Sequence, residues 1–155
     1  MQARQDDSAW TPARVFMAAS TLFHIPIAIV GFAYDRTFPI GPGAAEDAGS
    51  AHVFGVFETN GWHTLGALLV GAVSLYCVLR PRHARDGALA LGVFHVALVV
   101  SLVLWDPSTF WIASNAADQV VHAATAIGGI GSALLTRRNI GPWRTTRTSP
   151  TGSAS

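Results

Sequence analysis

The sequence contains little charge and no lysine. Only 12% of its 155 residues are Asp, Glu, Lys or Arg, and all ten basic residues are arginines. Ordinary soluble domains carry roughly 25% charged residues. The charges occur in short clusters, with long uncharged stretches between them. This distribution excludes an ordinary soluble core and is typical of membrane spans joined by polar loops. The net charge of +1 offers no basic surface for nucleic acid.

Cysteine is scarce as well. Cys77 is the only cysteine, which excludes an intrachain disulfide. Its apolar surroundings predict a small packing residue. The first apolar stretch follows a dozen polar residues and is longer than the roughly 7–15 apolar residues of a signal peptide. We therefore expect no cleaved signal. The exclusive use of arginine, with abundant Ala and Gly, is typical of proteins from GC-rich bacteria.

Long apolar stretches dominate what is present. Each is 19 to 23 residues long, and they cover residues 13–34, 60–79, 87–105 and 114–136. About 20 helical residues cross the hydrocarbon layer of a bilayer, and a lone strand would leave its backbone unsatisfied in lipid. The second and third stretches have too few polar residues for the wet face of a soluble bundle. The sequence predicts an all-α fold, with a four-transmembrane-helix bundle over residues 13–136. A polar segment, 1–12, precedes this domain and a disordered tail, 137–155, follows it.

Arginine predicts the orientation of the bundle. Nine of the ten arginines lie in the N-terminal segment, in the turn at residues 80–86 or in the C-terminal tail, and Arg36 is the exception. The positive-inside rule places these three regions, and both termini, in the cytoplasm. We expect a multi-pass protein of the bacterial cytoplasmic membrane. Aromatic residues near the predicted span ends suit interfacial anchors, namely Trp10, Tyr34, Trp62, Trp105 and Trp111.

The two halves of the chain resemble each other. Phe-His-Ile at 23–25 matches Phe-His-Val at 94–96, and an aspartate follows each histidine by eleven residues. Asn60-x-x-His63 matches Asn115-x-x-Asp118 in the same way. These matches predict two parallel two-helix repeats, related by an axis along the membrane normal.

The repeat places the intramembrane polar residues. His24 and His95 lie about 16 Å below the outer interface at 1.5 Å per residue, so we expect them to approach each other near the midplane. Asp118 and His122 are expected to face inward toward His63, nearer the outer surface, under a lid formed by the loop at residues 35–59. Small and polar residues share these helix faces, which is typical of helix contacts in membranes.

Two longer motifs carry a family resemblance. Asn60-Gly-Trp-His63-Thr-Leu-Gly-Ala67-Leu-Leu-Val-Gly71 and Asn115-Ala-Ala-Asp118-Gln-Val-Val-His122 resemble the bacterial family called domain of unknown function 4383. The similarity covers roughly residues 12–136 and implies a small four-span membrane protein. This chain departs from the family pattern at Ala67, where a second histidine would follow His63 by one turn. The resemblance implies no reaction.

The ionisable residues within the spans are candidate functional groups. His24 and His95 are candidate cofactor ligands, and His63, His122 and Asp118 are candidate metal ligands. The alternative for each histidine is a structural hydrogen bond across a helix interface. Asp118 can pair with His122 at a spacing of four residues.

Three further groups favour ordinary structural roles. Asn60 and Asn115 suit helix N-caps better than ligands, because each stands at the start of a span. His52 and His83 lie in loops, where we expect them to be solvated.

No enzyme signature is present, so we expect a non-enzymatic protein. The leading interpretation is a membrane protein whose buried polar residues hold the bundle together. A haem- or transition-metal-binding protein is the second, because histidines from facing helices can serve as ligands. A conduit for protons or small solutes is the third. The expected partners are the lipid bilayer and a second copy or another membrane protein, and nucleic acid is not expected.

Overall fold

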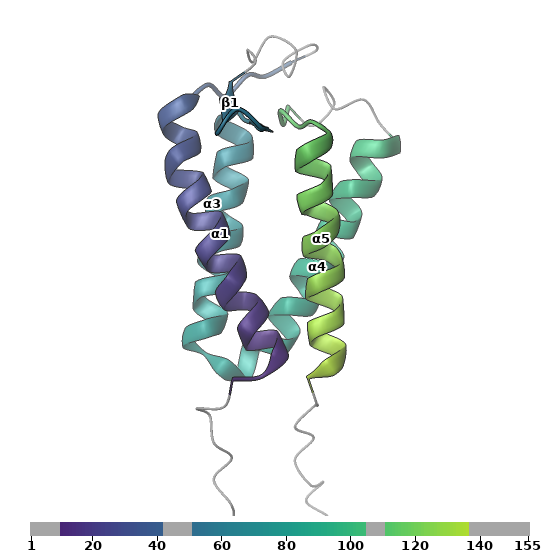
Figure 1. Ribbon diagram of the computed structural model, residues 1–155. Helices are drawn as coiled ribbons and strands as arrows, with labels where there is room; N and C mark the ends of the chain where they lie inside the picture. Colours follow the sequence, from purple (N-terminus) through teal and green to yellow (C-terminus); the bar gives the residue numbers. More distant parts are fainter. Residues whose placement is uncertain (1–9, 42–50, 105–110, 137–155) are drawn as a thin grey trace, which may run out of the picture.

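The computed structural model describes residues 10–41, 51–104 and 111–136, and this part of the chain is mostly helical (Figure 1). The long helices are α1 (Pro12–Tyr34), α3 (Gly61–Leu79), α4 (Ala84–Leu104) and α5 (Ala116–Leu135). A short 3-10 helix, η1 (Pro81–His83), joins α3 to α4. Two short strands, β1 (His52–Val53) and β2 (Phe57–Glu58), pair as an antiparallel hairpin.

Side-chain caps define where three of the helices begin. The Thr11 hydroxyl accepts from the Arg14 amide, and Pro12 stands at the first helical position of α1, where no intrahelical N–H is needed. The Asn60 side chain accepts from the His63 amide at the start of α3. Asn115 caps α5 in a capping box with Asp118. The predicted capping roles of Asn60 and Asn115 are confirmed.

The helices pack mainly as two pairs, α1 with α3 and α4 with α5. The start of α1 and the end of α5 lie at the same end of the bundle, and the hairpin lies at the opposite end (Figure 1). A hydrogen bond of 2.9 Å from the Ala13 amide to the Thr136 hydroxyl joins the two helix ends. Each pair is therefore one antiparallel unit, and the second unit begins again at the end where the first began.

The interior of the bundle holds small and polar residues, whereas large apolar side chains point outward. On α1, Ser20, His24, Ala28 and Gly31 are buried, whereas Leu22 is 76% exposed. On α5, Gly129 is buried and Ile127 is 75% exposed. A protein folded in water shows the reverse distribution, so these outer surfaces suit lipid.

Within the described residues, three segments are long and apolar enough to cross a membrane, namely α1, α3 and Pro81–Leu104. The fourth long helix, α5, is not among the segments that are long and apolar enough. Its first two turns carry Asp118, Gln119 and His122, which lower its mean hydropathy. The chain thus has the character of a membrane protein.

Backbone contact between α4 and α5 depends on glycine. A Cβ atom at Gly129 would stand 2.7 Å from the Ala88 carbonyl oxygen and 2.9 Å from the Gly92 Cα. A Cβ at Gly92 would stand 2.7 Å from the Ile130 nitrogen. The two helices approach at this depth because neither position carries a side chain.

Two local predictions need correction. The loop expected at 35–59 contains the β1–β2 hairpin, whose turn residues Phe54 and Gly55 both have positive φ. Strands of two residues are too short to show an alternating pattern. The turn expected at 80–86 is shorter than predicted, because Pro81 starts a 3-10 turn and α4 already begins at Ala84. The first nine residues, the tail from 137, Trp105 and Asp106 lie outside the described residues, so the predictions made for them stay predictions.

Candidate functional site

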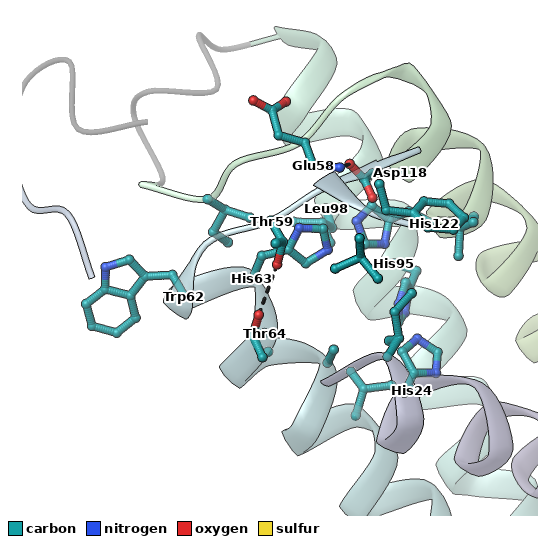
Figure 2. A pocket seen from close by; sticks show the side chains of 18 of the residues that line it. His24, Glu58, Thr59, Trp62, His63, Thr64, His95, Leu98, Asp118 and His122 are labelled. Carbon is teal, nitrogen blue, oxygen red and sulfur yellow. Dashed lines mark hydrogen bonds between the residues drawn. The ribbon is translucent and has the colours of Figure 1, made fainter. Parts of the chain in front are cut away.

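Four histidines line one cavity at the hairpin end of the bundle (Figure 2). His24 comes from α1, His63 from α3, His95 from α4 and His122 from α5. Each long helix described by the structure thus contributes one imidazole to the same space. The cavity measures about 100 Å³.

The imidazole rings form a continuous row. Ring centroids lie 6.1 Å apart between His24 and His95, 5.4 Å between His95 and His122, and 5.8 Å between His122 and His63. The expected approach of His24 and His95 is confirmed, and both are buried. The expected inward orientation of His122 toward His63 is confirmed as well.

The two deepest histidines hydrogen-bond to their own helices. His24 Nδ1 lies 2.9 Å from the Ser20 carbonyl oxygen, and His95 Nδ1 lies 2.8 Å from that of Leu91. Each acceptor lies four residues earlier, so the two rings are held in the same way in the two halves of the chain. The structural interpretation of these histidines predicted hydrogen bonds across a helix interface. The bonds observed at Nδ1 of His24 and His95 stay within one helix instead.

The two outer histidines differ from each other. His63 Nδ1 lies 2.8 Å from the Ala113 carbonyl oxygen and so links α3 to the segment before α5. His122 Nδ1 is buried and has no hydrogen-bond partner among the residues that the structure describes. A buried ring nitrogen normally has a partner, and the described residues supply none for this one.

Asp118 is buried but does not pair with His122. Its Oδ2 accepts from the Glu58 amide at 3.1 Å and from the Asn115 amide at 3.0 Å. The predicted pairing of Asp118 with His122 is therefore wrong. A spacing of four residues brings two side chains within reach, but here the backbone N–H groups of the hairpin and of the helix cap compete successfully for the carboxylate. Asp118 thereby fixes the hairpin over the cavity, as expected for a lid.

The two capping asparagines make reciprocal contacts between the halves. Asn60 Nδ2 donates to the carbonyl oxygen of Trp111 at 2.7 Å, and Asn115 Nδ2 donates to that of Val56 at 2.8 Å. In both cases the acceptor lies four residues before the other asparagine. A similar relation holds for the residues three positions after each asparagine, His63 and Asp118. His63 contacts Ala113, two residues before Asn115, and Asp118 contacts Glu58, two residues before Asn60.

Polar and apolar layers bound the cavity on the side away from the hairpin. The Ser20 hydroxyl contacts His24 Nδ1 at 3.2 Å and the Ser74 hydroxyl at 2.9 Å. Beyond this pair lies an apolar cluster that includes Met17, Cys77 and Leu91. The row of imidazoles thus ends about halfway through the bundle.

The candidate metal ligands and the volume of the cavity can be compared with what the predicted metal ion or haem would need. Within residues 10–41, 51–104 and 111–136, no three His, Cys, Asp or Glu side chains form a group that could hold a metal ion. A volume of about 100 Å³ is also below the roughly 300 Å³ at which pockets for drug-sized ligands begin. A porphyrin does not fit between the helices as they are packed here.

Several residues of the site were absent from the sequence prediction. Val53, Phe57 and Glu58 of the hairpin line the cavity, as does Trp62. Trp62 Nε1 donates to the Pro39 carbonyl oxygen at 3.0 Å, so it fixes the loop rather than only marking an interface. The composition of the 35–59 loop gave no signal for these contacts, because they depend on how the loop folds back over the bundle.

The comparisons with known proteins give a family and no activity. The family model described as "Domain of unknown function (DUF4383)" matches residues 14–135. Neither the search of curated proteins nor that of solved structures gave a match.

Proposed function

This chain belongs to the family described as domain of unknown function 4383, which carries no assigned reaction, and from its site we propose that it is a non-enzymatic binding protein of the bacterial cytoplasmic membrane. It crosses the membrane four times, with both termini in the cytoplasm. The histidine-lined cavity in its outer half binds one small, lipid-soluble molecule.

The outward face of α5 supports a fourth crossing. Val120, Ile127, Leu134 and Leu135 are each at least 69% exposed. The polar residues that lower the hydropathy of this helix, Asp118 and His122, line the cavity instead. A helix with one apolar face toward lipid and one polar face toward a cavity can span a bilayer, because its polar groups stay within the protein.

The reciprocal hydrogen bonds support a duplicated architecture. Asn60 and Asn115 each bridge to the other half at the same relative position, and His24 and His95 repeat the same backbone contact. A two-fold axis along the membrane normal relates such contacts. Both halves then face the same way across the membrane, which agrees with the nine arginines on one side.

The observation that carries the proposal is the convergence of one imidazole from each long helix on a single cavity. If these histidines served only to hold the helices together, they would bond across helix interfaces. His24 and His95 instead bond to their own helices, so these hydrogen bonds do not join helices, and both rings line the cavity. A cavity lined mostly by apolar side chains, with a few polar groups among them, is typical of small-molecule sites.

The other interpretations receive less support. The volume of the cavity argues against haem, as set out above. A conduit needs a polar path through the bundle, whereas the imidazole row meets the apolar cluster around Met17 and Leu91. Neither argument applies to a molecule that enters from the outer half and stays there.

Mass spectrometry of the protein extracted in native lipid discs tests the proposal. We expect wild-type protein to retain one small molecule in a fixed ratio. Ala67→Phe should lose it, because Ala67 lines the cavity and a phenyl ring would fill that space. Leu69→Phe is the matched control, since Leu69 lies on the same helix and is 59% exposed at the outer surface.

Two results would contradict the proposal. One is equal retention of the same molecule by wild type and Ala67→Phe, which would place it outside the cavity. The other is wild-type protein that retains no molecule in a fixed ratio, which would leave the cavity as a hydrated space.

A further inference from the structure

We propose that the cavity selects molecules whose head group donates hydrogen bonds, such as a phenol or an alcohol carried on an apolar body. This inference rests on the proposed binding function and specifies its ligand class. Its basis is the balance of donors and acceptors around the cavity.

Backbone contacts fix which ring nitrogen carries the proton. Nδ1 of His24, His63 and His95 each lies 2.8 to 2.9 Å from a carbonyl oxygen. A carbonyl oxygen only accepts, so each Nδ1 must be the donor. In a neutral imidazole the other nitrogen, Nε2, then bears a lone pair and can only accept.

These Nε2 atoms have no hydrogen-bond partner within the described part of the chain, yet all three rings border the cavity. The cavity therefore presents three acceptors from three different helices. A ligand that offers only acceptors of its own, such as a ketone or an ether, would leave them unsatisfied.

Most donors in the lining are already used. Trp62 Nε1 donates to Pro39. The hydroxyls of Thr59 and Thr64 bond to each other at 3.0 Å (Figure 2), which uses one of their two protons. The amides of Glu58 and Asn115 both donate to the Asp118 carboxylate. His122 can supply one N–H, whichever of its two nitrogens carries the proton. Because the cavity has more free acceptors than free donors, it favours a ligand that donates hydrogen bonds.

The size of the cavity limits the head group to about one ring. A cavity of about 150 Å³ can hold benzene, so about 100 Å³ suits a single small ring or a short hydroxylated chain. Larger apolar parts of the ligand must remain outside, among the lipid chains.

Two phenylalanines connect the cavity with the outer surface of the helices. Phe23 and Phe94 line it and are 39% and 52% exposed. Each ring meets the histidine that follows it edge to face, at 5.1 Å for His24 and 5.3 Å for His95. A ligand dissolved in the bilayer would therefore meet an apolar ring first and an imidazole acceptor behind it.

A matched pair of probes tests the donor requirement. 4-Nonylphenol and 4-nonylanisole share the ring and the alkyl tail, but only the phenol can donate. Binding to the full chain in nanodiscs is measured by calorimetry, with empty nanodiscs as the partition blank. We expect the phenol to bind about tenfold tighter than the ether, the size of effect that one hydrogen bond produces.

Variants assign the effect to the imidazoles. His95→Phe keeps a ring but removes one of the three acceptors, so the preference for the phenol should fall, and it should fall to near one when His24→Phe and His63→Phe are added. His95→Gln retains an acceptor oxygen and should keep part of the preference. This result would show that the loss in His95→Phe comes from the missing acceptor and not from misfolding. His83→Phe is the control, because His83 lies in η1 at the other end of the bundle, stacked on Tyr76.

Solid-state NMR of nitrogen-15 histidine supplies an independent readout, since it distinguishes protonated from unprotonated ring nitrogens. Equal affinity for phenol and ether would overturn the donor requirement but leave the proposed binding function intact. Failure of both probes to bind, protonated Nε2 atoms, or stoichiometric Zn²⁺ uptake by the wild-type protein would each overturn the inference. Loss of the proposed function itself would appear separately, as equal retention by wild type and Ala67→Phe in native discs.

Discussion

Asp118 shows at the scale of one residue how a buried carboxylate can organise a membrane protein without a cationic partner. Its Oδ2 accepts two backbone hydrogen bonds, one from the hairpin and one from the cap of its own helix. The carboxylate thus joins the lid to the start of α5.

Replacing Asp118 with Ala should leave the Glu58 and Asn115 amides without this acceptor. Each unsatisfied buried N–H costs about 1–3 kcal/mol, and both of these bonds are only partly buried, so we expect a loss in the lower part of the summed range, roughly 2–4 kcal/mol in the free energy of unfolding. Asp118→Asn retains an acceptor oxygen and should lose less. Reversible unfolding in mixed detergent micelles measures both variants. An Asp118→Ala protein as stable as wild type would show that the hairpin is held by other contacts.

Ala67 is the position where the chain departs from the family motif, and it lies one turn after His63 on the cavity side of α3. Histidines four residues apart on one helix face can chelate one metal ion. Ala67→His should therefore raise the affinity for Zn²⁺ by at least about tenfold, or about 1.4 kcal/mol. Calorimetry measures this gain, with Ala67→Leu as the control. An unchanged affinity would mean that position 67 does not face His63 from the same side.

At the scale of the helices, α4 and α5 pack closely where both carry a glycine, Gly92 and Gly129. Gly129→Ala should destabilise the bundle by about 1–3 kcal/mol, because the new Cβ meets backbone atoms of α4 that cannot move independently. Gly131→Ala is the matched control, since nothing lies within 4 Å of a Cβ built there. It should be neutral or stabilising by up to about 1 kcal/mol, because alanine favours helix. Similar losses in both variants would argue against close packing at Gly129.

The long helices were predictable because each is a long apolar run, and Asn60 and Asn115 mark where two of them begin. The approach of His24 and His95 was predictable because the repeat placed them at equal depth. By contrast, nothing local predicted the hairpin, whose strands have two residues each. The partner of Asp118 was predicted wrongly for a related reason. Sequence spacing identifies neighbours on a helix, but the Glu58 amide reaches Asp118 only through the tertiary fold.

The cavity itself also lay beyond prediction. Its volume, and the carbonyl oxygens that orient three imidazoles, depend on how far the two helix pairs separate. A sequence gives the side chains of a site but not the backbone groups that set their protonation. The histidines were therefore identified as candidates, whereas their acceptor character became apparent only from the contacts of Nδ1.

At the scale of the whole molecule, the proposed topology of two parallel helix pairs requires the start of α1, the α3–α4 connection and the end of α5 to share a side of the membrane. The arrangement in Figure 1 places these three points at one end of the bundle. Arg14, Arg80, Arg82 and Arg85 lie at that end, whereas Arg36 follows α1 at the other. By the positive-inside rule, this distribution supports the proposed cytoplasmic location of the arginine-rich end.

Reporter fusions test this orientation. Alkaline phosphatase should be inactive and a green fluorescent reporter bright when fused after Arg85 or Arg147, with the opposite result for a fusion at Asp47. The physical reason is that translocating arginines across an energised membrane is unfavourable, so the proposed topology keeps nine of the ten inside. Replacing Arg80, Arg82 and Arg85 together with Gln should weaken the bias and give mixed signals at Asp47, whereas replacing Arg36 alone should not. An active phosphatase after Arg85 in the unmodified protein would reverse the topology and move the histidine cavity to the cytoplasmic half of the membrane.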